Sequence, residues 1–413
     1  MNTATTSSKV TFEQVRDEVR SDDAGKWDLV APREQLQFEG GALTVSLDDC
    51  GQHIERLTPT AWATTQFCQR LGIPASYFRK CPPQLQDAQG NYWIKNAPSE
   101  PAENGGKRRS QHTSKPEQWL LRARYGVLRG VLSERYSRLD NEALLTSVQQ
   151  VLETVSSRFE TSWFALSDES LHLRLIDPTQ KREALPDDGL MAGIHIANSE
   201  VGKRAVTVDA MVFRLVCSNG LIRLVKGKSL LYQRHIHLSQ DRFAGALETA
   251  VGEALGAATS FMDQIAVATR ESVKDVEEAI KKISGNWNLS QSTEERVLQA
   301  LLEESSSQPE ALYGVVNAFT NAAQTLPADD RYDLKVLAGH LVEHGIAQSL
   351  RVRSSAKRRA GRERTSDPGR NGDFSNGRHL TAQDAASANL ALATKFTPLF
   401  ASGNGDAESE VEW

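Results

Sequence analysis

The chain contains little cysteine. Its 413 residues include only four, Cys50, Cys68, Cys81 and Cys217, and they are scattered along the sequence. A disulfide framework, or a zinc site made from paired Cys-x-x-Cys motifs, requires more thiols at closer spacing. We therefore expect reduced cysteines and a cytoplasmic protein.

Long apolar runs and a large excess of one charge are also missing. No run of about 18 apolar residues occurs, and the first residues, MNTATTSSKVTFEQVRDEV, contain no apolar signal core. The sequence thus predicts a soluble protein that is not exported and has no membrane partner. Because the net charge is only −5, any affinity for nucleic acid has to come from local patches.

The sequence lacks the common nucleotide-binding motifs. The stretches GKRRS and VKGKS have no upstream glycine at the spacing of GxxxxGK[ST], and no GxGxxG follows an expected strand. This disfavours NTP hydrolysis and dinucleotide chemistry. Scattered acids such as Asp140, Asp177 and Asp209 have no spacing that singles out a nuclease site. We expect no cofactor, and we identify no catalytic residue.

Hydrophobic periodicity predicts a first group of elements before residue 100. One short helix is expected at residues 12–19, and the alternation in residues 43–47 is typical of a strand. A helix that begins after Thr58 or Thr60 is expected to end at Gly72, with a proline just beyond.

The middle of the chain predicts hairpins and a helix rather than a regular βαβ alternation. Two strand-like runs in residues 119–136 meet at Tyr125-Gly126, and a helix follows with Asp140 or Asn141 as its cap. A second hairpin is expected over residues 159–176. The fold class is therefore α+β, with a mixed β-hairpin and helix core.

The C-terminal part predicts a mostly α-helical region and then a flexible tail. Residues 241–283 are Ala-rich and helical in pattern, with a bend expected near Gly256, and Ser292 with Glu295 forms a capping-box pattern. We divide the chain into a polar arm at residues 1–40, an α+β core at 41–240, a helical region at 241–348 and a basic, then acidic, tail at 349–413.

Three ordered stretches resemble a known family. They are FCQRLGIPASYFRKCP, LLRARYGVLRGVLSERYSRLDN and ANSEVGKRAVTVDAMVFRLVCSNGLI, with weaker agreement in LYGVVNAFTNAAQTL. Together they resemble the phage/plasmid-like protein family, which is classed as domain of unknown function 932, over roughly residues 43 to 345. The resemblance implies carriage on mobile elements and a cytoplasmic setting. It implies no established activity and offers no catalytic residues.

Basic residues interleaved with aromatic ones are the most consistent functional signal. Such a groove is typical of single-stranded nucleic-acid binding, because cations hold phosphates and aromatic faces stack on bases. For phosphates we predict Arg122, Arg124, Arg129, Arg135, Arg223, Lys226 and Lys228; for stacking we predict Tyr125 and Tyr136. The alternative is that these strands alternate arginine outward and aromatics inward, as half-exposed strands commonly do.

Three histidines are candidates for a metal site or for catalysis. His235 and His237 are two residues apart, so on a strand both imidazoles project from one face, and His195 is a third candidate ligand. A lone His-x-His on a basic strand is more often a surface feature. The His195, His235 and His237 set is the basis of an alternative function, an enzyme acting on nucleic acid with or without a metal.

The sequence Cys217-Ser218-Asn219-Gly220 interrupts an apolar run. Serine, asparagine and glycine favour a tight turn, and the cysteine is then a small buried side chain. A nucleophilic thiol needs a nearby base, for which His195 and His235 are candidates, but nothing in the spacing requires either to lie close to Cys217.

The preferred hypothesis is a DNA-binding protein of a mobile element that holds single-stranded DNA in annealing, recombination or replication. The acidic end, GNGDAESEVEW, is either a docking tail for host or element-encoded replication and recombination proteins or a solvated segment. A further alternative is a protein that binds a host protein in anti-defence.

Overall fold

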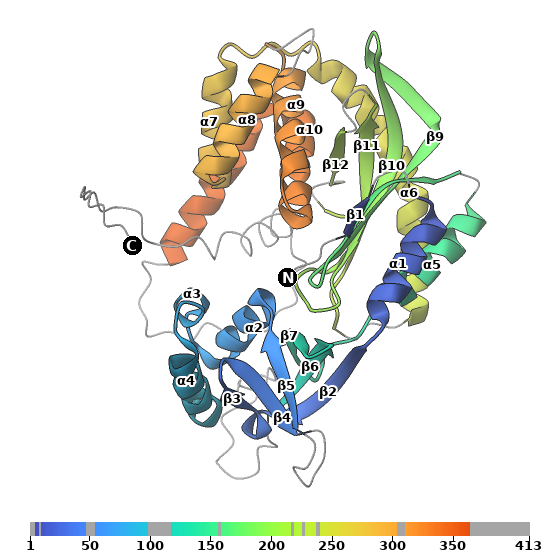
Figure 1. The fold of residues 1–413 in the computed structure, drawn as a ribbon. Coiled ribbons are helices and arrows are strands. Elements are labelled where there is room, and N and C mark those ends of the chain that lie inside the picture. The colour runs from blue at the N-terminus through green and yellow to red at the C-terminus, as the bar shows by residue number, and fades with distance from the viewer. Residues whose placement is uncertain are drawn as a thin grey trace, which may run out of the picture.

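The computed structural model describes residues 5–7, 10–46, 54–97, 117–155, 158–215, 219–224, 228–236, 240–303 and 310–363. Within these residues the fold is α+β, as the sequence predicts. Two sheets, each covered by helices, lie at an angle to each other (Figure 1). The acidic end of the predicted tail lies outside the described residues.

The first sheet is formed by residues 26–133. In the described part of the chain its order is β2-β6-β7-β5-β4-β3, and only the β5–β7 pair is parallel. Its strands are β2 (Lys26–Pro32), β3 (Gln37–Glu39), β4 (Ala42–Ser46), β5 (Ile54–Pro59), β6 (Gln118–Arg124) and β7 (Val127–Ser133). The 3₁₀ turn η1 (Arg33–Gln35) and the helices α2 (Ala61–Leu71), α3 (Ala75–Phe78) and α4 (Pro83–Asn96) complete this part.

Local sequence signals position the helices of this part. The Thr60 side chain accepts a hydrogen bond from the Ala63 N–H, and Gly72 ends α2 with a φ of 69°, so the predicted start at Thr60 and end at Gly72 are confirmed. The predicted hairpin is also present, because Tyr125 and Gly126 both have positive φ between β6 and β7. A shared core includes Phe67, Trp119 and neighbouring aromatic side chains.

The second sheet has the order β1-β8-β9-β10-β11-β12, with β13 also paired to β11, among the residues that the structure describes. Its strands are β1 (Thr5–Ser7), β8 (Glu160–Leu166), β9 (Leu171–Leu185), β10 (Asp188–Asn198), β11 (Val206–Arg214), β12 (Asn219–Arg223) and β13 (Leu231–Gln233). The antiparallel pairing of β8 with β9 confirms the second predicted hairpin. Cys217 and Ser218 lie outside the described residues, between β11 and β12.

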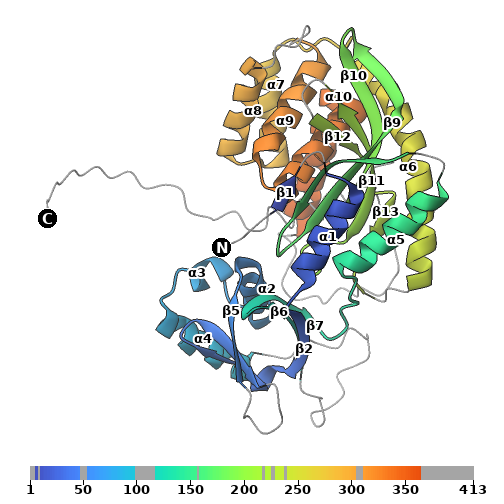
Figure 2. The same ribbon diagram turned by 45° about the vertical axis from the view of Figure 1, so that its right-hand side comes forward.

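One face of the second sheet is apolar. Side chains such as Ile194, Ile196, Val206 and Val208 pack with α1 (Phe12–Asp23), α5 (Asn141–Thr154) and the first half of α6 (Gln240–Ala268). Further along, Ala192, Ala210 and Val212 join a core formed with the second half of α6 and the C-terminal helices. Figure 2 shows α6 running along this face with α1 and α5 beside it.

The C-terminal helices are α7 (Val276–Trp287), α8 (Gln291–Glu303), α9 (Leu312–Ala322), the 3₁₀ turn η2 (Ala323–Thr325) and α10 (Ala328–Glu363), which breaks at Gly345. The start of α10 lies against the other face of the second sheet (Figure 1). Gly339 makes this approach close, because a Cβ there would be 2.0 Å from the Ile222 carbonyl oxygen. No helix in the described ranges has the length and apolarity needed to span a bilayer.

Several predicted boundaries differ from the structure. α6 is continuous through Gly256, and the chain breaks instead between Ala268 and Val276. The cap of α8 is Ser290, whose side chain accepts from the Thr293 N–H, rather than Ser292. The first helix begins at Phe12, after a reciprocal capping box of Thr11 and Gln14, and it extends past residue 19 to Asp23.

The close contact at Gly339 predicts a specific sensitivity. We expect Gly339→Ala to lower the free energy of unfolding by about 1–3 kcal/mol, because the added methyl group has to displace α10 from β12. The control is Gly252→Ala in α6, where a Cβ meets nothing within 4 Å. That change should raise stability by about 0.4–1 kcal/mol. Urea unfolding of both variants measures the contrast, and equal effects would contradict it.

Candidate functional site

The arginines predicted to hold phosphates lie inside the protein and contact carboxylates. Arg122, 3% exposed, donates to Asp28 at 2.9 Å, to Asp140 at 2.5 Å and to the Glu200 carbonyl at 2.7 Å. Arg129, 2% exposed, donates to the Glu200 carboxylate at 2.8 Å. Their charges are compensated, so the predicted phosphate-binding role does not fit these positions.

Glu200 is the centre of this buried network. Besides Arg129, its carboxylate contacts Lys26 Nζ at 3.0 Å and accepts the Asn141 N–H at 2.9 Å, at the first turn of α5. Burial opposes ionisation, but the Lys26 and Arg129 cations and the Asn141 N–H together lower the pKa of Glu200 to about 2. These contacts join β2, β7 and α5 to the loop between β10 and β11, residues 199–205.

Other predicted residues are also engaged within the fold. Arg124 forms ion pairs with Asp22 and Asp168. Arg223 donates to the Ala257 carbonyl at 2.7 Å and lies 3.6 Å from Glu343. The Tyr136 hydroxyl donates to the Ser199 carbonyl at 2.9 Å, and its ring stacks on His235.

Three of the predicted nucleic-acid residues are exposed. Tyr125 is 73% exposed at the β6–β7 turn, and Arg135 and Lys228 are exposed on loops. Lys226 lies outside the described residues. The predicted stacking position at Tyr125 and the predicted cations at Arg135 and Lys228 therefore remain predictions.

Two of the three candidate histidines lie in the described residues, and they have different neighbours. His235 is stacked on Tyr136, and burial lowers its pKa to about 4. His195 lies beside His172, which was not among the predicted residues, and His237 is outside the described residues. In the part of the chain that the structure describes, no three His, Cys, Asp or Glu side chains are grouped to hold a metal ion.

His195 belongs to a buried polar seam between the second sheet and α10. Alternation along β9 and β10 places His172, Arg174 and His195 on the face opposite the apolar core. From α10, Asp329, Tyr332 and Lys335 approach the same face. The Tyr332 hydroxyl donates to Asp209 of β11 at 2.8 Å. Sheet faces covered by a helix are usually apolar, so this seam is the most unusual feature of the core.

Asp329 connects the seam to the β10–β11 loop. Its carboxylate contacts His172 at 3.0 Å, Arg204 at 2.8 Å and Lys203 at 2.9 Å, and it accepts from the Ser170 hydroxyl at 3.2 Å. Burial opposes its ionisation, but His172 and Arg204 hold the pKa of Asp329 well below its ordinary value.

The two seam histidines are neutral at physiological pH. Burial lowers the pKa of His172 to about 4 and that of His195 well below its ordinary value. A neutral His172 that donates to Asp329 through Nε2 accepts at Nδ1 from His195 Nε2, 3.3 Å away. His195 Nδ1 then remains an acceptor with no hydrogen-bond partner among the described residues.

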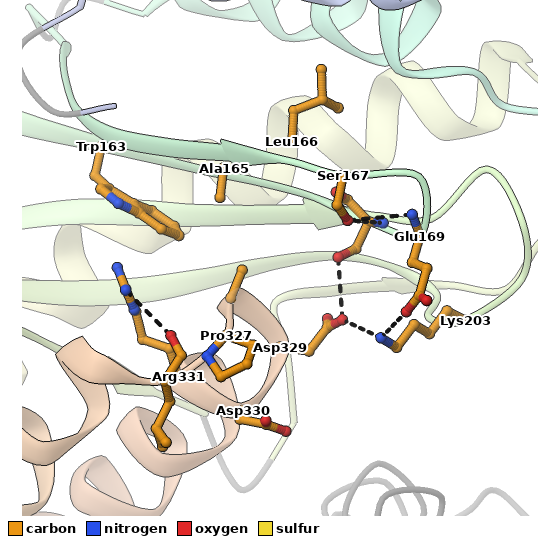
Figure 3. A pocket seen from close by; sticks show the side chains of 13 residues that line it. Trp163, Ala165, Leu166, Ser167, Glu169, Lys203, Pro327, Asp329, Asp330 and Arg331 are labelled. Carbon is orange, nitrogen blue, oxygen red and sulfur yellow. Dashed lines mark hydrogen bonds and ion pairs between the residues drawn. The ribbon is translucent and has the colours of Figure 1, made fainter. Parts of the chain in front are cut away.

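A cavity of about 250 Å³ opens at the edge of the seam, beside the start of α10 (Figure 3). At one end lie Trp163 and Arg331, and at the other lie Glu169, Lys203 and Asp329. Two cation–π contacts surround the indole, since the Arg174 and Arg331 guanidinium carbons are 4.1 and 4.8 Å from the Trp163 ring centroid.

A second candidate site is an exposed patch on α3 and α4. Three aromatic side chains there are 38–58% exposed, and three exposed cations lie among them: the residues of this α3–α4 patch are Tyr77, Arg79, Lys80, Tyr92, Trp93 and Lys95. Gln89 Nε2 donates to the Tyr77 hydroxyl at 3.1 Å, and the Tyr92 and Trp93 rings are 5.2 Å apart, so the patch is continuous. Its three cations form no ion pair with any described residue.

The α3–α4 patch has a local sequence signal, whereas the seam has none. Tyr77, Arg79 and Lys80 are adjacent in ASYFRK, and Tyr92, Trp93 and Lys95 follow within NYWIK. A solvent-exposed position cannot be recognised from these short, weakly periodic segments. The seam is harder to predict, because it joins residues more than 100 positions apart.

A comparison with protein families finds a match for the central part of the chain. Residues 129–333 match the model of a family described as a domain of unknown function, DUF932. The chain belongs to this family. The DUF932 match includes the second sheet from β8 onward, the β10–β11 loop and the cavity, whereas the α3–α4 patch precedes it. The family predicted from the sequence is confirmed. No curated protein and no solved structure matches the chain.

The Glu200 network of the DUF932 domain should be essential for stability. We expect Glu200→Gln to cost about 3–5 kcal/mol of unfolding free energy, because the buried Arg129 then loses its nearest carboxylate and Lys26 loses one of its three. The control is Lys282→Ala, which removes an exposed pair with Glu278 and should cost less than about 1 kcal/mol. Denaturant titration measures both, and similar losses would contradict a central role for Glu200.

The same variant should reveal a pH dependence. The folded-state pKa of Glu200 is lowered from 4.5 to about 2, so its stabilising contribution is complete above pH 4.5 and is lost as the pH falls toward 2. The stability difference between wild type and Glu200→Gln should therefore shrink between about pH 5 and about pH 3. A difference that stays constant over this range would show that Glu200 ionisation is not the cause.

Proposed function

We propose that this chain binds single-stranded nucleic acid, most simply single-stranded DNA, through the α3–α4 patch. The observation that carries the proposal is the exposure of Tyr77, Tyr92 and Trp93 next to Arg79, Lys80 and Lys95, whose charges no described carboxylate neutralises. Single strands require both features, since phosphates bind cations and unpaired bases stack on aromatic rings.

The neighbourhood of the patch supports this assignment. Among the residues of α3 and α4 the only acid is Asp87, and its carboxylate accepts the Gly40 and Gly41 N–H groups. An anionic strand over the patch therefore meets little repulsion. Four further basic residues follow α4 in the sequence and lie outside the described residues: Lys107, Arg108, Arg109 and Lys115.

The biological setting we propose is a mobile element. The resemblance to phage/plasmid-like proteins supports it, and a single-strand-binding protein fits annealing, recombination or replication of such an element. Of the earlier predicted contacts, Tyr125, Arg135 and Lys228 remain available as a secondary set, because their side chains are exposed.

Fluorescence anisotropy with a labelled oligothymidine tests the proposal. We expect wild-type protein to bind at low salt, with a slope of log Kd against log salt near 2 if the three patch cations contact phosphates. Lys80→Ala with Lys95→Ala should reduce that slope by about 1.4. Tyr92→Ala with Trp93→Ala should weaken binding by about 2–6 kcal/mol, since each stacked base contributes about 1–3 kcal/mol.

Matched controls make the result specific. Lys281→Ala with Lys282→Ala removes two exposed lysines of α7, and Tyr232→Ala removes an exposed tyrosine of β13. Both control variants should bind like wild type. The proposal fails if wild type does not bind at low salt, or if patch and control variants lose affinity equally.

A further inference from the structure

Three cations of the seam have no acidic partner in the described part of the chain. Arg174 is 3% exposed, and its Nε and Nη2 atoms are buried without a hydrogen bond. Lys335 is 1% exposed and forms neither a hydrogen bond nor an ion pair with a described residue. Arg331 donates only to the carbonyls of Gln324 and Leu326, and its Nε is unpaired.

These three side chains converge on one place. Trp163 of β8 is the direct cross-strand partner of Arg174 on β9, and both Arg174 and Arg331 contact its indole. Lys335 lies one helical turn beyond Arg331 on the same side of α10. Burial, Arg174 and Arg331 together lower the pKa of Lys335 well below its ordinary value.

The acids that line the cavity form no ion pair with these three cations. Asp329 contacts His172, Arg204 and Lys203, Glu169 pairs with Lys203, and Asp330 forms no ion pair with a described residue. From the sheet, Arg174 and the neutral His195 face Lys335. Buried cations without counter-ions are strongly unfavourable in a folded protein. Such a cluster of buried cations is stabilised when an anion binds to it.

We propose that Arg174, Arg331 and Lys335 bind the phosphate group of a phosphate monoester that enters through the cavity beside Trp163. Trp163 and Arg331 line this cavity (Figure 3), and Arg174 contacts the same indole, so the cavity borders the three cations. Planar guanidinium groups match the geometry of phosphate oxygens. A cavity of about 250 Å³ suits a small organic group attached to the phosphate rather than a large cofactor.

The phosphate monoester can belong to either of two ligands, a free mononucleotide-like molecule or the 5′ end of a nucleic-acid strand. The inference does not rest on the α3–α4 patch, because the two sites share no residue. Loss of strand binding in the patch variants therefore leaves it intact.

Thermal unfolding of the full chain in different anions is the first test. At matched ionic strength, inorganic phosphate and thymidine monophosphate should raise the wild-type Tm above its value in chloride. Lys335→Met and Arg174→Met should melt at or above wild type without phosphate, because each removes a buried basic group that has no acidic partner among the described residues. Neither variant should gain Tm on phosphate addition.

Calorimetric titration and controls complete the test. Arg331→Gln, at the half-buried rim, should weaken thymidine monophosphate binding by at least about 30-fold even if a core variant fails to fold. Arg182→Met and Lys281→Met remove exposed cations elsewhere and should respond to phosphate like wild type. Comparing 5′-phosphorylated with 5′-hydroxyl oligothymidine separates a strand end from a free monoester. No phosphate-specific rise in wild-type Tm, or an equal rise in all variants, overturns the proposal.

Discussion

The β10–β11 loop, residues 199–205, holds the two sheets and α10 together. Glu200 binds Arg129 and Lys26 of the first sheet, and the Val201 carbonyl accepts from Trp62 and Gln66 of α2. A few residues later, Lys203 and Arg204 of the same loop pair with Asp329 at the start of α10. Because these are charged groups removed from water, each depends on its partner, and the relative position of three elements depends on one short loop.

The second sheet separates two kinds of chemistry on its two faces. Alternation along each strand sends aliphatic side chains toward α6, whereas the face toward α10 carries polar side chains beside a smaller apolar cluster. The apolar face supplies most of the packing energy, which allows the opposite face to keep histidines, acids and unpaired cations buried. The cavity opens where this polar seam reaches the start of α10, and the family match includes both.

Cations in this protein occupy three distinct environments. Those on β6 and β7 were predicted to be phosphate contacts, but they form ion pairs within the protein. These pairs belong to the buried network around Glu200. Those on α3 and α4 are exposed beside aromatic rings, and those of the seam are buried without acids. The sequence presents all of them as arginine and lysine near tyrosine or tryptophan, so composition alone cannot distinguish the three environments.

The sequence by itself determined the α+β class, the family, the caps of α2, and the β6–β7 and β8–β9 hairpins, because these depend on neighbouring residues and on short periodicities. Tertiary structure alone decided which charges are compensated. Arg122 meets Asp28 and His172 meets Asp329 across 94 and 157 positions of sequence, and no local pattern encodes such a pairing. Whether a cation binds a ligand or a neighbouring carboxylate depends on that long-range packing, since burial and partner together set the energy of a charge.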